Sequence, residues 1–208
     1  MKSVTYKLVE FFVLFIVFPI SLALKYAIQI KLILGFLGFL YVLYVLLKVN
    51  KNTFKIDETV HWKRFWKRTL IKFVLIVIIT TLFVWFTNKD ALFNVVLNKP
   101  WLWLIILFVY AFLSVYPQEL IYRTFFFQRY ENLFKNENLF LFVNAIVFSL
   151  GHIFFRNTLV IVLTFLGGLL FAFTFSKTRS TLLVSIEHAI YGCWLFTVGM
   201  GNMLGFPS

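Results

Sequence analysis

The chain has 208 residues, of which 62% are hydrophobic and only 13% charged, and this composition excludes an ordinary soluble domain. Its formal net charge of +12 comes from 20 Lys and Arg against 8 Asp and Glu. The cations gather between apolar segments, so we expect them to fix topology and contact membrane lipids, and we expect no nucleic-acid partner. The single cysteine, Cys193, excludes an intrachain disulfide and a multi-cysteine metal site.

Apolar stretches recur along the chain, each long enough to cross ~30 Å of hydrocarbon as a helix. They predict seven transmembrane helices, at roughly residues 8–24, 32–47, 70–87, 101–130, 139–155, 158–175 and 181–200. Between the second and third helices, residues 48–72 mix lysine and arginine with aromatic rings, which favours an interfacial amphipathic helix along the headgroup layer. The sequence therefore predicts an all-α fold, a polytopic membrane helix bundle.

No repeat, low-complexity tract or linker interrupts the chain, so we expect residues 1–208 to form a single integral membrane domain. Residues 1–100 hold the first three helices and the basic segment, and residues 101–200 hold a catalytic core of four helices. Lys and Arg number 14 on the side of the N-terminus and 5 on the other side, which indicates a cytoplasmic N-terminus. We expect the protein to reside in the plasma membrane.

Four ionisable residues lie inside the apolar core, where a charge is costly unless it is paired, hydrated or facing a cavity. Glu119 and Arg123 lie one helical turn apart in the stretch YPQELIYRTFFFQRY, after Pro117, which predicts a kink. His152 lies in FSLGHIFF and His188 in SIEHAIYG. Glu119 and His152 are each about 16 residues from the turn between their helices, so both should reach a similar depth. The sequence predicts one site formed by these residues.

The same residues also have structural explanations. Arg123 can serve only to neutralise Glu119, and a histidine in a membrane helix often donates a hydrogen bond between helices. Glu187 is as well suited to binding a neighbouring helix as to chemistry. As a group, one carboxylate and two imidazoles suit hydrolysis by an activated water, and they equally suit zinc ligation. A transporter with a proton relay would predict inverted repeats, which the sequence does not contain.

Three stretches together resemble the CPBP family of intramembrane proteases, which includes the CAAX prenyl endopeptidases and relatives linked to bacteriocin immunity. The family pattern is Glu-Glu-x-x-x-Arg, then Phe-x-x-x-His, then a His followed one turn later by Asn. It is matched over about residues 101–200 by Gln118, Glu119, Arg123, Phe148, His152 and His188. The resemblance implies an intramembrane endopeptidase, often described as a metalloprotease, that acts on a hydrophobic or lipid-modified peptide or protein.

The resemblance also implies roles for single residues. The catalytic residues would be Glu119, Arg123, His152 and His188. Glu119 and the two histidines would be the ligands if a metal such as Zn²⁺ is used, and a mechanism without metal is equally compatible. Gln118, Phe148 and Cys193 would contact the substrate.

Two positions depart from the family pattern. Gln118 replaces the first glutamate, which leaves Glu119 to act alone as the base. Gly192 and Cys193 stand where the final Asn is expected. These departures keep open a second function, that of a catalytically inactive relative that binds a membrane peptide or acts as an immunity or regulatory protein.

Overall fold

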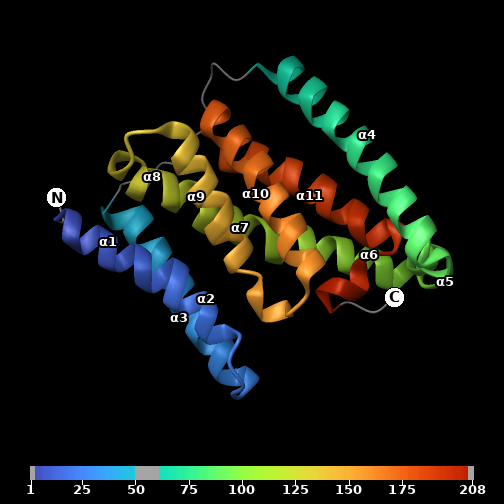
Figure 1. Cartoon of the computed structure of the whole chain (residues 1–208), viewed down its shortest axis with the longest axis horizontal. Coiled ribbons are helices and arrows are strands. Elements are labelled where there is room, and N and C mark those ends of the chain that lie inside the picture. Colours follow the sequence, from blue (N-terminus) through green and yellow to red (C-terminus); the bar gives the residue numbers. More distant parts are fainter. Residues whose placement is uncertain (1–2, 50–60, 206–208) are drawn as a thin grey trace. The chain divides into compact units, whose positions relative to one another are not determined.

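The computed structural model describes residues 3–49 and 61–205, and this part of the chain is built from helices without a strand. Seven stretches within it are long and apolar enough to cross a membrane, namely Val4–Leu22, Ile28–Lys48, Trp62–Thr87, Pro100–Leu133, Glu137–Phe155, Thr158–Thr178 and Thr181–Val198. Figure 1 shows the helices in chain order. The predicted all-α polytopic bundle of seven helices is confirmed.

The chain forms two compact units, residues 1–55 with 118–181, and residues 56–117 with 182–208. The helices of the first unit are α1 (Val4–Phe12), α2 (Phe18–Leu22), α3 (Ile28–Tyr44), α8 (Phe126–Tyr130), α9 (Glu137–Leu150) and α10 (Thr158–Thr178). Those of the second are α4 (Trp62–Thr87), α5 (Asn94–Asn98), α6 (Pro100–Phe108) and, after its first residue, α11 (Thr181–Val198). The single domain expected from the sequence stays a prediction.

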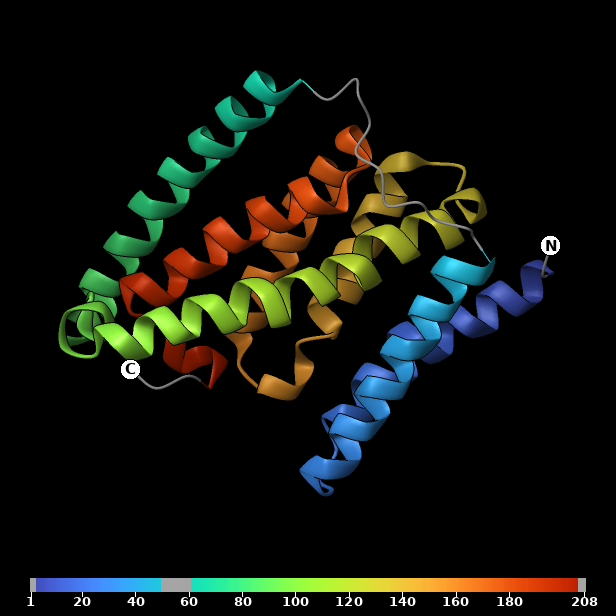
Figure 2. The same cartoon turned by 180° about the vertical axis from the view of Figure 1, so that it is seen from behind.

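In the first unit, α9 and α10 pack side by side as a hairpin (Figures 1 and 2). The side chain of Asn157 begins α10 by accepting a hydrogen bond from the backbone N–H of Leu159 at 2.9 Å. The two helices approach closely at Gly168, where a Cβ would lie 3.0 Å from the Ala145 Cα. Small residues allow such packing between membrane helices, whose association gains little from the hydrophobic effect.

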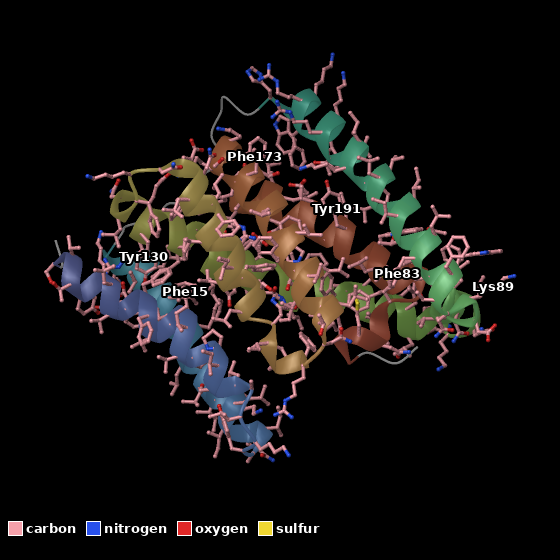
Figure 3. The ribbon with its side chains drawn as sticks, in the orientation of Figure 1. Phe15, Phe83, Lys89, Tyr130, Phe173 and Tyr191 are labelled. Carbon is pink, nitrogen blue, oxygen red and sulfur yellow. The ribbon has the colours of Figure 1, made fainter. Side chains whose placement is uncertain are left out.

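A buried carboxylate joins three helices of the first unit. Glu10 on α1 accepts hydrogen bonds from Arg129 Nε at 2.6 Å and Tyr130 Oη at 3.2 Å, both on α8, and from the hydroxyl of Tyr41 on α3. The rings of Phe15 and Tyr130 meet edge to face, with centroids 5.9 Å apart (Figure 3). The side chains of Glu10 and Arg129 are buried, so each charge depends on the other for compensation. The sequence analysis did not single out this pair.

In the second unit, polar side chains join α4 to α11. Glu187 accepts from Lys72 Nζ and, at 2.8 Å, from the hydroxyl of Tyr191; Tyr191 is labelled in Figure 3. The indole N–H of Trp194 donates to Thr80 Oγ1 at 2.8 Å. Glu187 therefore binds a neighbouring helix, one of the two roles considered for it from the sequence.

The sequence predicted a separate amphipathic helix along the headgroup layer over residues 48–72. The described part of this range does not form a separate helix. Residues 50–60 lie outside the described residues, and residues 62–72 form the first turns of α4, which continues to Thr87. With 26 residues, α4 is about 39 Å long, whereas the hydrocarbon layer needs ~30 Å. The extra turns carry the basic and aromatic residues, which suit the headgroup region because their apolar stems and rings stay at its inner edge.

We expect Glu10→Gln to lower the free energy of unfolding in detergent by about 3 to 5 kcal/mol, because the buried Arg129 then lacks a counter-charge. The measurement is a chemical unfolding curve of the purified protein. Glu137→Gln is the matched control, because the side chains of Glu137 and Lys177 are 57% and 51% exposed. Such a pair contributes about 0 to 1 kcal/mol. Equal losses in the two variants would contradict the role of the buried pair.

Candidate active site

The fourth span carries the predicted carboxylate in an irregular part of its helix. The helix continues through Pro117, but its backbone is π-helical on both sides, in η4 (Val109–Val115) and η5 (Leu120–Phe125). The four residues of α7 (Tyr116–Glu119) lie between them. Pro117 has no N–H to donate, so the hydrogen-bond pattern changes around it, and π-helical segments often occur at functional sites. The disturbance expected at Pro117 takes this form.

Glu119 and Arg123 form a buried ion pair in the first unit. Arg123 Nε lies 3.3 Å from Glu119 Oε2, and both side chains are 0% exposed. The guanidinium also donates to Asn144 Oδ1 on α9 at 2.7 Å and to the Gly168 carbonyl on α10 at 3.4 Å. These bonds fix Arg123 against two other helices. Because Glu119 is paired with Arg123, the bonds to Asn144 and Gly168 also restrict the position of the Glu119 carboxylate.

His152 lies in a turn rather than within a continuous helix over 139–155. The α-helix of α9 ends at Leu150, and η7 (Ile153–Phe155) follows His152. His152 Nδ1 lies 2.8 Å from the Phe148 carbonyl. A carbonyl can only accept, so Nδ1 carries the proton and Nε2 carries the lone pair. This tautomer suits a proton acceptor or a metal ligand.

The ring of Phe148 connects the ion pair to the histidine. Its centroid lies 4.8 Å from Arg123 Cζ and 4.9 Å from the centroid of the His152 ring. Tyr122 meets the same ring edge to face at 5.1 Å. The first unit thus places two side chains against the ring of Phe148. One is Arg123, which is paired with Glu119, and the other is His152. The similar depth expected for Glu119 and His152 stays a prediction.

His188 belongs to α11 in the second unit and is buried, with 6% of its surface exposed. Its Nε2 lies 3.0 Å from the hydroxyl of Tyr110 on η4. Gly192, one turn further along α11, faces the same tyrosine, because a Cβ there would lie 2.0 Å from Tyr110 Oη. Cys193 Sγ lies 3.9 Å from the Leu107 carbonyl. The structure therefore gives His188 a hydroxyl neighbour that the sequence did not indicate.

The other predicted residues keep the status of predictions. Gln118 is half-buried beside Glu119, and neither it nor Phe148 or Cys193 has a tested role in binding substrate. That His188 and Glu119 belong to one site is likewise a prediction from the sequence. Tyr110, Tyr122 and Asn144 were missed, and the only available signal was that they are polar residues within apolar segments.

Glu119, His152 and His188 were the ligands expected if a metal is used, and a mechanism without metal was equally compatible with the sequence. Within residues 3–49 and 61–205, no group of three or more His, Cys, Asp or Glu side chains is close enough to hold a metal ion. The Glu119 carboxylate is paired with a buried cation, which competes with its use as a zinc ligand. Glu119 and His152 belong to the first unit and His188 to the second, so zinc stays a prediction and no chemical step is derived through it.

Part of the chain matches the model of a known protein family. Residues 99–194 match the family model described as Type II CAAX prenyl endopeptidase Rce1-like. The match begins just before α6 and ends within α11, so it contains Glu119, His152 and His188. No curated protein and no solved structure matches the chain. The match covers 96 of the 208 residues and supports the predicted membership of the CPBP family of intramembrane proteases, which includes the type II CAAX prenyl endopeptidases.

Proposed function

We propose that the protein is an intramembrane endopeptidase that hydrolyses a peptide bond in a hydrophobic or lipid-modified substrate. The observation that carries the proposal is the fully buried carboxylate of Glu119, held by Arg123 and connected through Phe148 to a histidine of fixed tautomer. A charge inside an apolar helix bundle is costly, so a retained one needs a structural or a chemical role. The family match over the same residues supports a protease.

In the proposed mechanism Glu119 is the general base. It takes a proton from a water molecule while the oxygen of that water bonds to the scissile carbonyl carbon, and the π electron pair of the carbonyl moves to its oxygen. His152 Nε2 accepts a hydrogen bond from the same water and orients it. His188 is proposed to support the oxyanion, a role that rests on the family resemblance. The intermediate collapses when the carbonyl re-forms, and the leaving amine takes the proton from Glu119.

Arg123 acts as a positioning residue in this mechanism. Its guanidinium lies beside the Glu119 carboxylate, and its bonds to Asn144 and Gly168 restrict where that carboxylate can move. A base fixed in this way loses little entropy in the transition state. Glu187, although equally buried, is bound to Lys72 and Tyr191 and takes no part.

The proposed setting is the plasma membrane, with the N-terminus in the cytoplasm. The uneven distribution of Lys and Arg supports this orientation. Large apolar side chains are exposed on the spans, including Phe86 at 80% and Trp101 at 79%, which suits contact with lipid tails and a lipid-modified substrate.

A second candidate is an inactive relative that binds a membrane peptide, and the observation that favours it is Gln118, which cannot act as a base. Gln118→Glu tests it, because a large gain of cleavage over the natural chain would indicate lost activity. Replacing Gly192 alone by Asn does not make the same test, since a side chain there collides with Tyr110.

We expect Glu119→Gln to lower cleavage of a fluorogenic farnesylated CAAX peptide by about 10²- to 10⁴-fold in proteoliposomes, because the amide cannot accept the proton of water. The measurement is the initial rate per folded protein. Glu10→Gln is the matched control, because it also removes a buried carboxylate paired with an arginine. It should lower stability and leave kcat unchanged. Full activity of Glu119→Gln would exclude Glu119 as the base.

We expect the losses caused by Glu119→Gln and His188→Ala to be strongly non-additive if both residues act on one substrate. Residues that work as a unit give a double variant about as slow as the slower single variant. The measurement is a double-variant cycle on kcat/KM with the same peptide. Multiplication of the two losses would indicate that His188 acts independently of Glu119.

We expect cleavage to persist after treatment with 1,10-phenanthroline, because Glu119 is engaged with Arg123 and can activate water without a metal ion. Metal content before and after treatment is measured by mass spectrometry. Stoichiometric zinc that is lost in His152→Ala and His188→Ala, together with loss of activity, would instead establish a zinc mechanism.

A further inference from the structure

Tyr110 is positioned next to His188 by the packing of the second unit. Its hydroxyl lies 3.0 Å from His188 Nε2, and the two rings meet edge to face with centroids 6.0 Å apart. The ring of Tyr110 also meets Phe196 edge to face at 4.8 Å. Phe196 belongs to a buried cluster with Val95 and Ile106, against which Tyr110 packs. The phenol is therefore held on one side by an apolar cluster and presents its oxygen to His188.

Gly192 is the residue that makes room for this hydroxyl. A Cβ at position 192 would lie 2.0 Å from Tyr110 Oη, 2.3 Å from Cε1 and 2.4 Å from Cζ, and real Cβ atoms do not approach so closely. Positions 188 and 192 are one turn apart, so they share a face of α11. The Tyr110 phenol occupies the space beside His188 that a side chain at position 192 would otherwise fill.

We propose that Tyr110 donates a hydrogen bond to the oxyanion of the tetrahedral intermediate, with His188 bonded behind it. The inference rests on the proposed function and names a catalytic residue for it. His188 Nε2–H donates to Tyr110 Oη, and the Tyr110 O–H then donates to the negatively charged oxygen. No proton is transferred in this step, and the hydrogen bond is released when the carbonyl re-forms.

The chemistry of a phenol suits this role. It is a stronger donor than an aliphatic hydroxyl, and the hydrogen bond that it accepts from His188 polarises its O–H further. A donor fixed before the reaction stabilises developing charge without reorganisation, and one such donor typically contributes about 10²- to 10³-fold in kcat. The packing around Tyr110 supplies this fixed position, while Gly192 keeps the position open.

The test measures kcat and KM for the farnesylated CAAX peptide in proteoliposomes, normalised to folded protein. We expect Tyr110→Phe to lower kcat by about 100-fold or more and to change KM by less than about 3-fold, because the donor acts in the transition state. Tyr191→Phe is the matched control, since it removes a buried hydroxyl bonded to Glu187 and the Thr69 carbonyl. It should lower stability and keep kcat.

Two further variants separate a catalytic from a structural role. Gly192→Ala keeps the hydroxyl but displaces it, so kcat should fall, whereas Gly35→Ala, with open space around its Cβ, should have no effect. Tyr110→Ala frees the space at position 192. Adding Gly192→Asn to it places an amide donor there and should restore kcat by about 10-fold or more relative to Tyr110→Ala.

The outcomes distinguish the two proposals. If the natural chain cleaves the peptide and Glu119→Gln does not, but Tyr110→Phe and Gly192→Ala keep the natural kcat, this inference is wrong and the proposed function stands. If the natural chain cleaves nothing, the proposed function fails and the inference fails with it. A lower kcat in Tyr110→Phe that the Asn substitution does not rescue would indicate that the tyrosine only supports the fold.

Discussion

The cost of holding charge inside an apolar helix bundle governs the polar architecture of this chain. Every buried carboxylate in the described residues has a cation beside it: Glu10 has Arg129, Glu119 has Arg123 and Glu187 has Lys72. The Glu10–Arg129 and Glu187–Lys72 pairs also join different helices, whereas Glu119 and Arg123 lie on the same span. An unpaired charge in hydrocarbon is far more costly than the entropy of ordering two side chains. Of these three buried pairs, only Glu119–Arg123 has both members within residues 99–194, which match a protease family.

Arg123, the partner of Glu119, is itself bonded to two further helices. Glu10 accepts hydrogen bonds from Arg129, Tyr130 and Tyr41, and Glu187 accepts from Lys72 and Tyr191. In both pairs these donors bind the carboxylate itself. Beside Glu119, Arg123 donates to Asn144 Oδ1 and to the Gly168 carbonyl, so the cation of this pair is anchored. An anchored cation can hold a carboxylate in place while that carboxylate exchanges a proton.

Hydropathy and length predicted the spans well because each lipid-crossing helix must satisfy its own backbone and display a long apolar surface. They could not predict where α9 ends, since Gly151 and His152 are as compatible with a helix end as with an apolar span. The charge pattern singled out Glu119 and the two histidines, but it did not reveal Glu10 or Tyr110. Their roles depend on which helices pack together, and that information is not local in the sequence.

Near each of the two histidines in the sequence, a glycine lies against a tyrosine hydroxyl. Tyr110 Oη lies against Gly192, one turn from His188, and a Cβ at Gly151 would lie 2.1 Å from Tyr122 Oη, immediately before His152. Both tyrosines come from the fourth span, one from η4 and one from η5, on the two sides of Pro117. A π-helical turn advances the chain by an extra residue relative to an α-turn, so it changes which side chains face a given direction. Tyr110 and Tyr122 thus come from the two π-helical segments that flank α7, the short α-helical piece that carries Glu119.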